Sequence, residues 1–170
     1  MYVSLNAPLF ERVKVVYEKK DSLGLDVDQM TLLENSYKGF VRGGANLPED
    51  KKAEYGKLSE ELSLATLQFG KNVLAATNAY TLHITDSADL AGLPDFVKVM
   101  AAETAKSKEL EGWAFTLQAP SYVPFMQYST KRNLREQMWK AYNTRAIGGE
   151  NDNTEVVKKI AQLRIKIANI

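Results

Sequence analysis

The first two apolar patterns in the chain are helical. Asn6 and Pro8 begin the first predicted helix, and Gly24 ends it. Its apolar residues lie three or four positions apart, which places them on one face: Leu9, Val13, Val16 and Tyr17.

A second helix begins at Asp26, which has the residue type and position of an N-cap, with Gln29 three positions later. Leu25 and Met30 occupy the positions of a hydrophobic staple, so we expect a well-defined helix start. The predicted buried stripe of this helix precedes Gly43 and consists of Met30, Leu33, Tyr37 and Val41.

The segment from Arg42 to Pro48 ends this helix and begins a much longer one. Gly43 and Gly44 follow the helix end, and Pro48 suits the first turn of the next helix. The helical pattern then continues to about Thr77, so we predict a helix over residues 48–77, roughly 45 Å long at ~1.5 Å per residue. Because this helix exceeds the diameter of a small domain, we expect it to pack against more protein than this chain contains.

The apolar positions of the long helix alternate in three- and four-residue steps: Tyr55, Leu58, Leu62, Ala65, Phe69, Val73 and Ala76. Additional apolar residues in its second half lie outside this seam: Leu64, Leu67, Leu74 and Ala75. We therefore expect the second half to be covered on more than one side, either by this chain or by protein outside it.

Residues 80–85 and 113–117 alternate apolar with polar side chains and are rich in β-branched and aromatic types, so we predict two short strands. A two-stranded ribbon is marginal alone, and it should lean on a helix over residues 94–108. The pattern leaves the strand direction open. The fold class is therefore mainly α, a multi-helix array with one long helix and a small two-stranded β ribbon.

Three further helices are predicted after the second strand, over residues 122–128, over residues 130–145 and from Asn153 onward. The last one carries an apolar stripe of Val156, Ile160, Leu163, Ile167 and Ile170. Neither glycine nor proline follows this stripe, so we expect residues 1–170 to be a single helical region cut from a longer protein. Fraying of a natural C-terminus is the alternative.

Composition excludes several function classes. The chain has 22 Lys and Arg against 21 Asp and Glu, so it lacks the basic surface that nucleic acid or acidic membranes require. No apolar run approaches the ~20 residues that span a bilayer, so we expect a soluble protein. There is no cysteine, which excludes disulfides but leaves the compartment open between cytoplasm and periplasm.

The sequence offers no catalytic or metal-binding constellation, and it does not identify substrate-binding residues. His83 is the only histidine, so no HExxH motif can exist, and its place on the polar side of a strand favours an exposed or hydrogen-bonded role. No G-x-S-x-G elbow is present, so a Ser-His-Asp triad has no support.

Other chemical possibilities are weaker than structural ones. Gly43-Gly44 lacks the P-loop context and is interpreted as a helix end. The acidic neighbours Glu60-Glu61 and the pair Asp86 and Asp89 suit solvated surface and N-capping better than acid-base catalysis. For one aromatic series we predict core packing and not base stacking: Tyr122, Phe125, Tyr128, Trp139 and Tyr142.

Several short stretches, taken in their order and spacing, carry a family resemblance. They include residues 17–18 and 21–23, 40–47 (FVRGGANL), 77–79 (TNA), 89–94 (DLAGLP), 115–117, 120–121, 124–128 (PFMQY), 134–136 and 141–145 (AYNTR). In these residues the chain resembles the thimet oligopeptidase and peptidyl-dipeptidase family of zinc metallopeptidases, in particular its bacterial dipeptidyl carboxypeptidase branch. The match is to the non-catalytic part of that family.

The resemblance implies a largely helical parent enzyme with two lobes beside a deep channel, in which this region forms part of the N-terminal wall. It also implies a zinc ion held by the histidines of an HExxH helix and a downstream glutamate, with the motif's glutamate as general base. None of these residues has a counterpart here, so we expect this chain alone to bind no catalytic zinc and to hydrolyse nothing. Its expected partners are the missing catalytic half of the same polypeptide and short peptides.

Two alternatives stay open. The first is a free-standing helical interaction module that uses the apolar second half of the long helix as a docking surface. The second is an oligomer formed by the truncated faces, which should depend on protein concentration.

Overall fold

The computed structural model describes Val3 and residues 5–170, which fall into two compact units. Unit 1 comprises Met1–Ala65 and Lys159–Ile170, and unit 2 comprises Thr66–Lys158. The predicted single helical region over residues 1–170 stays a prediction.

Unit 1 begins with two helices, α1 (Ala7–Glu18) and α2 (Val27–Arg42), joined through the 3-10 turn η1 (Lys20–Ser22). Asn6 caps α1 by accepting a hydrogen bond from the Leu9 amide at 3.0 Å. Asp26 accepts from the Gln29 amide at 2.8 Å, and the Gln29 side chain accepts from the Asp26 amide at 3.2 Å. Both predicted helix starts are therefore confirmed, because each cap satisfies amides that the first turn leaves unpaired.

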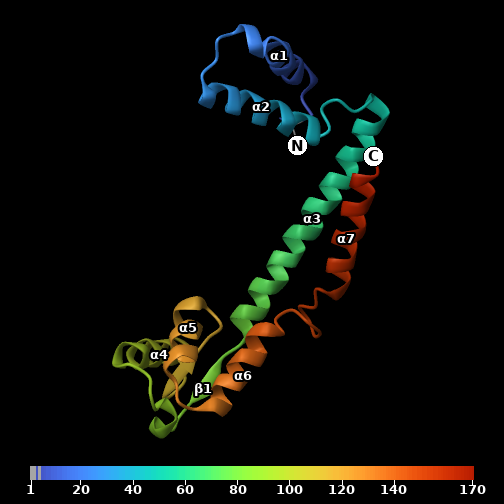
Figure 1. The fold of residues 1–170 in the computed structure, drawn as a ribbon. Helices are drawn as coiled ribbons and strands as arrows, with labels where there is room; N and C mark the ends of the chain where they lie inside the picture. The colour runs from blue at the N-terminus through green and yellow to red at the C-terminus, as the bar shows by residue number, and fades with distance from the viewer. Residues whose placement is uncertain (1–2, 4) are drawn as a thin grey trace. The chain divides into compact units, whose positions relative to one another are not determined.

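Helices α1 and α2 lie side by side (Figure 1), and aromatic side chains form much of their contact. Phe10 is buried against the rings of Tyr37 and Phe40, and Tyr17 stacks on Tyr37 with ring centroids 3.9 Å apart. The predicted stripe of α1 is therefore partly wrong, since Phe10 is its buried residue while Val16 is exposed. The cause is that the larger ring at position 10 finds two aromatic partners on α2.

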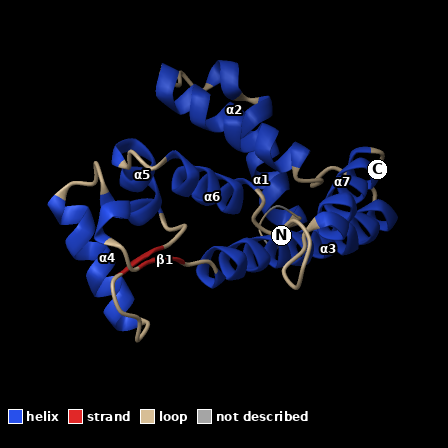
Figure 2. Ribbon diagram, turned by 90° about the horizontal axis from the view of Figure 1, so that it is seen from below, coloured by secondary structure: helices blue, strands red, loops and turns tan. Residues whose placement is uncertain are grey.

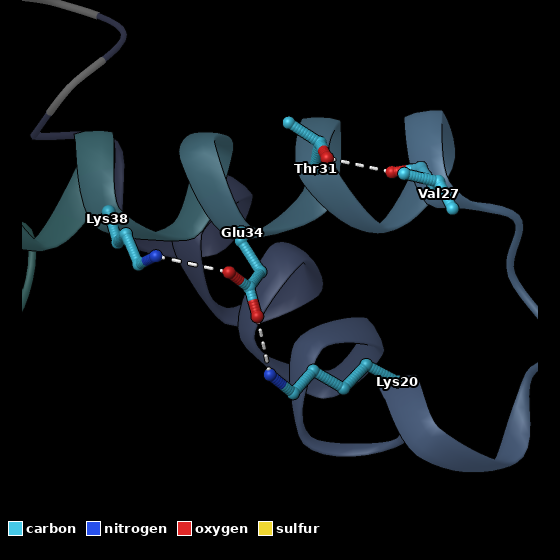
Figure 3. A network of polar contacts seen from close by, with 5 residues as sticks. All are labelled: Lys20, Val27, Thr31, Glu34 and Lys38. Carbon is cyan, nitrogen blue, oxygen red and sulfur yellow. Dashed lines mark hydrogen bonds and ion pairs between the residues drawn. The ribbon is translucent and has the colours of Figure 1, made fainter.

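A polar contact also fastens η1 to α2 (Figure 3). The Glu34 carboxylate accepts from Nζ of Lys20 at 2.8 Å and from Nζ of Lys38 at 3.1 Å. The hydrogen bond from Lys20, followed by the one from Lys38, holds the pKa of Glu34 below its ordinary value. The bond between Lys20 and Glu34 also raises the pKa of Lys20.

The long helix α3 (Glu49–Ala79) confirms the helix predicted over residues 48–77. Gly43 caps the preceding α2 with its amide bonded to the Gly39 carbonyl, as the helix-end interpretation predicted. On α3 itself Ala65 and Thr77 are buried, whereas Leu64, Leu67 and Leu74 are exposed. Within the described residues, then, the chain leaves the extra apolar positions of the second half uncovered.

In the last helix, α7 (Thr154–Ala168), the residues of the predicted apolar stripe are the least exposed ones. Leu163 is buried, and Val156, Ile160, Ile167 and Ile170 are partly buried. The periodicity therefore placed the inner face of α7 correctly.

Unit 2 contains the sheet and the helices α4 (Asp95–Ser107), α5 (Ala119–Tyr128) and α6 (Arg132–Asn143). Strands β1 (Leu82–Ile84) and β2 (Trp113–Phe115) pair antiparallel, with Leu82 opposite Phe115, and α4 packs on β2 (Figure 2). The 3-10 turn η2 (Ser87–Leu90) follows β1. The mainly helical fold class and the supporting helix over residues 94–108 are confirmed.

Several boundaries differ from the predictions. The first strand covers Leu82–Ile84 and not residues 80–85, and α6 covers Arg132–Asn143 and not residues 130–145. The second strand ends at Phe115 because the Thr116 amide donates to Oγ of Ser121 at 3.0 Å and so leaves the ladder. Helix α5 begins three residues before the predicted 122–128 segment, since Pro120 occupies its first turn, where no amide is needed.

The core of unit 2 lies between the sheet and its helices. It is built from fully buried large side chains and smaller apolar ones: Leu82, Ile84, Leu90, Leu93, Val97, Phe115, Leu117, Phe125, Leu134 and Met138. Gly92 allows a close approach beside this core. Its φ is +87°, and a Cβ there would lie 2.3 Å from the Tyr128 carbonyl oxygen.

Candidate functional site

The described residues contain no group of three or more His, Cys, Asp or Glu side chains that could hold a metal ion. His83 lies on the exposed side of β1, and its Nε2 is 2.6 Å from the Glu111 carbonyl oxygen. This confirms the exposed, hydrogen-bonded role predicted for His83. The described residues therefore do not fit the zinc ion that the family resemblance implies, and no reaction step is assigned to a metal.

The acidic pairs have structural partners or face solvent. Asp86 caps η2 by accepting from the Ala88 amide at 2.8 Å, and Asp89 forms an ion pair with Lys131 at 3.2 Å. Glu60 and Glu61 are exposed on α3. Capping by Asp86 and a solvated Glu60-Glu61 surface are confirmed, whereas the partner of Asp89 could not be inferred from local sequence.

The aromatic series divides between core and surface. Phe125 is fully buried against Phe115, with ring centroids 4.7 Å apart, and Tyr122 stacks on Tyr142 at 4.2 Å. Two members contradict the predicted core packing, because Trp139 is 53% exposed and Tyr128 is also exposed. Since successive helix residues are ~100° apart, the buried Met138 turns the neighbouring Trp139 outward.

A cluster of four side chains joins α3, α5 and α6; we call Thr77, Tyr122, Tyr142 and Arg145 the Tyr142 cluster. The Arg145 guanidinium lies 3.7 Å from the centroid of the Tyr142 ring, and its Nε donates to the Tyr142 carbonyl at 2.8 Å. Its Nη1 also donates to Oγ1 of the buried Thr77 at 3.3 Å. Burial, followed by the neighbouring Tyr142, raises the pKa of Tyr122.

A second polar contact connects the start of α7 with α3. Oδ1 of Asn153 accepts from Nδ2 of Asn72 at 2.9 Å, and Nδ2 of Asn153 donates to the Phe69 carbonyl at 3.1 Å. Sequence reasoning identified Asn153 only as the start of a helix. The run of Asn and Asp before α7 signals a cap, but nothing in it indicates a side chain that reaches a helix 81 positions away.

A hollow of about 380 Å³ lies beside the Tyr142 cluster. Apolar and polar groups both line it, among them Ala76, Tyr80, Leu117, Arg145 and Glu150. Burial raises the pKa of Tyr80, which keeps its hydroxyl protonated. The lining offers apolar, aromatic and charged contacts to a bound group.

A smaller hollow of about 260 Å³ lies on α5 and α6 and is lined by Met126, Arg132, Arg135, Glu136 and Trp139. Arg135 donates to the Ser129 carbonyl, and Glu136 pairs with Lys140 at 2.6 Å. Trp139 and Arg132 are exposed and Met126 is partly buried, and Trp, Met and Arg are residue types enriched at protein contact surfaces.

Several of the stretches that carry the family resemblance lie in unit 2, and some of them are in contact there. Residues 77–79 meet residues 141–145 through Thr77 and Arg145, and the Asn78 side chain accepts from Gln118 at 2.8 Å. The segment 89–94 meets the end of α5, where the Thr130 amide donates to the Ala91 carbonyl at 2.9 Å. These contacts connect elements of unit 2 that are far apart in the sequence.

Comparison with known proteins identifies relatives of this chain. No family profile matches the chain. Oligopeptidase A of Escherichia coli (strain K12) is 38% identical over 151 residues, which is 86% of this chain and 22% of that protein. The probable cytosolic oligopeptidase A of Arabidopsis thaliana is 35% identical over 170 residues, and the dipeptidyl carboxypeptidase of Escherichia coli (strain K12) is 32% identical over 170 residues.

The last two matches cover 96% and 99% of this chain but only 24% and 25% of the relatives. The chain is a homologue of oligopeptidase A and dipeptidyl carboxypeptidase, which confirms the predicted resemblance to the thimet oligopeptidase and peptidyl-dipeptidase family. It spans about a quarter of the length of these relatives. No helix among the described residues is long and apolar enough to cross a membrane.

Proposed function

We propose that this chain forms part of the N-terminal wall of the substrate channel in a zinc-dependent oligopeptidase or dipeptidyl carboxypeptidase. The observation that carries the proposal is the 32–40% identity to oligopeptidase A and dipeptidyl carboxypeptidase over nearly the whole chain. The parent polypeptide is then a peptidase that acts on short peptides, and its zinc and catalytic residues lie in the remaining three quarters of its length.

The residues of this chain support an architectural role. With His83 as its single histidine, the chain cannot supply an HExxH zinc motif. Its long-range side-chain contacts, such as Arg145 with Thr77 and Asn153 with Asn72, fix helices relative to one another within unit 2. A rigid wall selects substrates by shape, because it admits a short flexible peptide and excludes a folded protein.

The test compares the chain with its parent. The gene around this segment should encode an HExxH motif in the same reading frame, and the purified full-length protein should contain zinc and cleave a quenched fluorogenic nonapeptide. A chelator should remove this activity, and zinc should restore it. Residues 1–170 alone should not cleave the peptide, with or without zinc, and a full-length variant with Gln for the HExxH glutamate is the matched control. Turnover by the isolated chain would refute the proposal.

The second candidate is the free-standing helical interaction module. One observation favours it, the exposure of Leu64, Leu67 and Leu74 on α3. A reading frame that lacks any metallopeptidase motif would support the module and would contradict the channel-wall proposal.

A further inference from the structure

An apolar groove of about 610 Å³ runs between α1 and α2 in unit 1. Three apolar residues of α1 and three from the α2 side line it: Leu9, Val13, Val16, Leu25, Leu32 and Leu33. The groove is a different surface from the aromatic contact that joins the two helices, where Phe10 and Tyr17 meet Tyr37. We call it the α1–α2 groove.

The α1–α2 groove exposes large aliphatic side chains. Leu32 is 69% exposed, and Leu9 and Val16 are also exposed. A contiguous apolar surface of this kind costs free energy in water, so it marks a contact with another group.

The spacing of the lining residues indicates the shape of that group. Leu9, Val13 and Val16 lie at intervals of four and three on α1. On α2 the lining residues Gln29, Leu32 and Ser36 lie at intervals of three and four, with Leu33 beside them and Leu25 just before the helix. Such rows on two neighbouring helices form the ridges between which the apolar face of a third helix packs.

Charge specifies the occupant further. Arg12 is the one charged residue that lines the groove, and it makes no hydrogen bond or ion pair with any residue that the structure describes. Covering the groove would remove its guanidinium from water, which is costly without a carboxylate partner. An occupant that fits therefore combines an apolar stripe with an acidic side chain opposite Arg12.

We propose that the α1–α2 groove receives an amphipathic helix from the part of the parent polypeptide outside this chain, with a carboxylate of that helix facing Arg12. This inference rests on the proposed function, because it requires a longer parent. The relatives support it, since this chain accounts for only 22% of the length of Escherichia coli oligopeptidase A and most of such a polypeptide remains to supply the helix.

Thiol labelling tests the proposal. The chain has no cysteine, so a single cysteine at Leu32→Cys reports on the groove, and its maleimide labelling is followed by mass spectrometry of that peptide. We expect labelling to be at least about tenfold slower in the full-length protein than in residues 1–170, because a docked helix must open first. Val27→Cys is the matched control; Val27 is 81% exposed on the same helix, does not line the groove and should label equally in both.

The charge is tested in the full-length protein carrying Leu32→Cys. Arg12→Glu should accelerate labelling by about tenfold or more, because it places two carboxylates together, whereas Arg12→Lys should change it little. Lys19→Glu, an exposed charge reversal outside the groove, is the control. Because Leu32→Cys shortens a lining side chain, Ser36→Cys serves as a second reporter of nearly unchanged size in the same groove.

Each result decides the question. Equal labelling of the two proteins at both groove positions overturns the proposal, and so does protection that appears only when a short peptide substrate is added. Protection in residues 1–170 that rises with protein concentration would assign the groove to a second copy and would also overturn it. Labelling and peptidase activity are measured separately. A protected groove in a full-length protein without peptidase activity would therefore contradict the proposed function but not the docking of a helix in the groove.

Discussion

Asn153 at the start of α7 accepts a hydrogen bond from Asn72 of α3 over 2.9 Å. Asn153 is only 4% exposed, and its own side-chain amide donates to the Phe69 carbonyl. Gln68 extends the network by donating to Oδ1 of Asn72 at 2.7 Å. A buried side-chain amide whose oxygen and nitrogen are both hydrogen-bonded fixes the distance and the register between two helices. An apolar contact would specify the register less strictly.

We predict that Asn153→Ala lowers the free energy of unfolding by about 2 kcal/mol, because it removes two hydrogen bonds in a partly buried site. The Asn72 amide keeps only the longer bond to the Asp152 carbonyl, at 3.4 Å, and the Phe69 carbonyl loses its bond from Asn153. Urea denaturation followed by circular dichroism measures the loss. A double-mutant cycle with Asn72→Ala isolates the pair, and its coupling energy should be clearly above zero. Asn35→Ala, at a position of α2 where the structure shows no side-chain hydrogen bond, should cost little. Additive effects of the two substitutions would contradict the pairing.

Local signals in the sequence were enough to place most helices. The capping residues Asp26 and Gln29 predicted where α2 begins. The segment from Gly43 to Pro48 predicted where α2 ends and α3 begins. Both predictions were possible because caps and helix breakers act within a few residues. The stripe on α7 was placed by periodicity alone. Antiparallel pairing of β1 and β2 was not predictable, because alternation fixes the faces of a strand and not its direction.

Contacts between distant side chains could not be predicted in the same way. Arg145 reaches Thr77, 68 positions earlier, and neither residue carries a local signal of the other. Periodicity favours Leu9 and Val16 for the buried face of α1 although Phe10 is the buried residue, because either face is possible until the aromatic partners on α2 are known. For the same reason the sequence did not reveal the α1–α2 groove, which requires two helices in contact.

Gly92 should not tolerate a side chain. Gly92→Ala must place a Cβ 2.3 Å from the Tyr128 carbonyl oxygen at a φ of +87°, so the backbone of the Ala91 to Thr130 contact has to move. We predict a loss of about 3 kcal/mol or more in the free energy of unfolding, the sum of overpacking and left-handed strain.

Gly148→Ala separates these two causes. Gly148 has a φ of +75°, but no atom lies within 4 Å of the position that a Cβ would take, so this variant should lose only about 1 kcal/mol. Thermal unfolding of both variants gives the comparison. Similar losses for the two variants would show that steric contact at Gly92 contributes little.

Stability should depend on pH through Glu34. Hydrogen bonds from Lys20 and Lys38 lower its pKa in the folded chain, so its contribution is present above the unfolded pKa of about 4.3 and is lost as pH falls through the folded value. Between pH 6 and pH 3 the wild type should therefore lose more stability than Glu34→Gln. Urea midpoints across this range measure the difference, with Glu61→Gln as the exposed control. Parallel pH profiles for wild type and Glu34→Gln would contradict the assignment.

Arg145 should not be replaceable by lysine, because three geometrically distinct contacts converge on its planar guanidinium. It lies over the Tyr142 ring and donates to the Tyr142 carbonyl and to Thr77. A lysine ammonium keeps the charge but cannot stack and donate in the same fork.

We therefore predict that Arg145→Lys and Arg145→Met both lower the free energy of unfolding by about 1 kcal/mol or more, with little difference between them. Hydrogen exchange of α6 amides should accelerate in both variants, which locates the effect within unit 2. Arg164→Lys, at an exposed position of α7, should leave stability unchanged. If Arg145→Lys were as stable as the wild type, the positive charge alone would be enough to hold the cluster together. The stacked geometry of the guanidinium would then not explain how Arg145 connects α3 with α6.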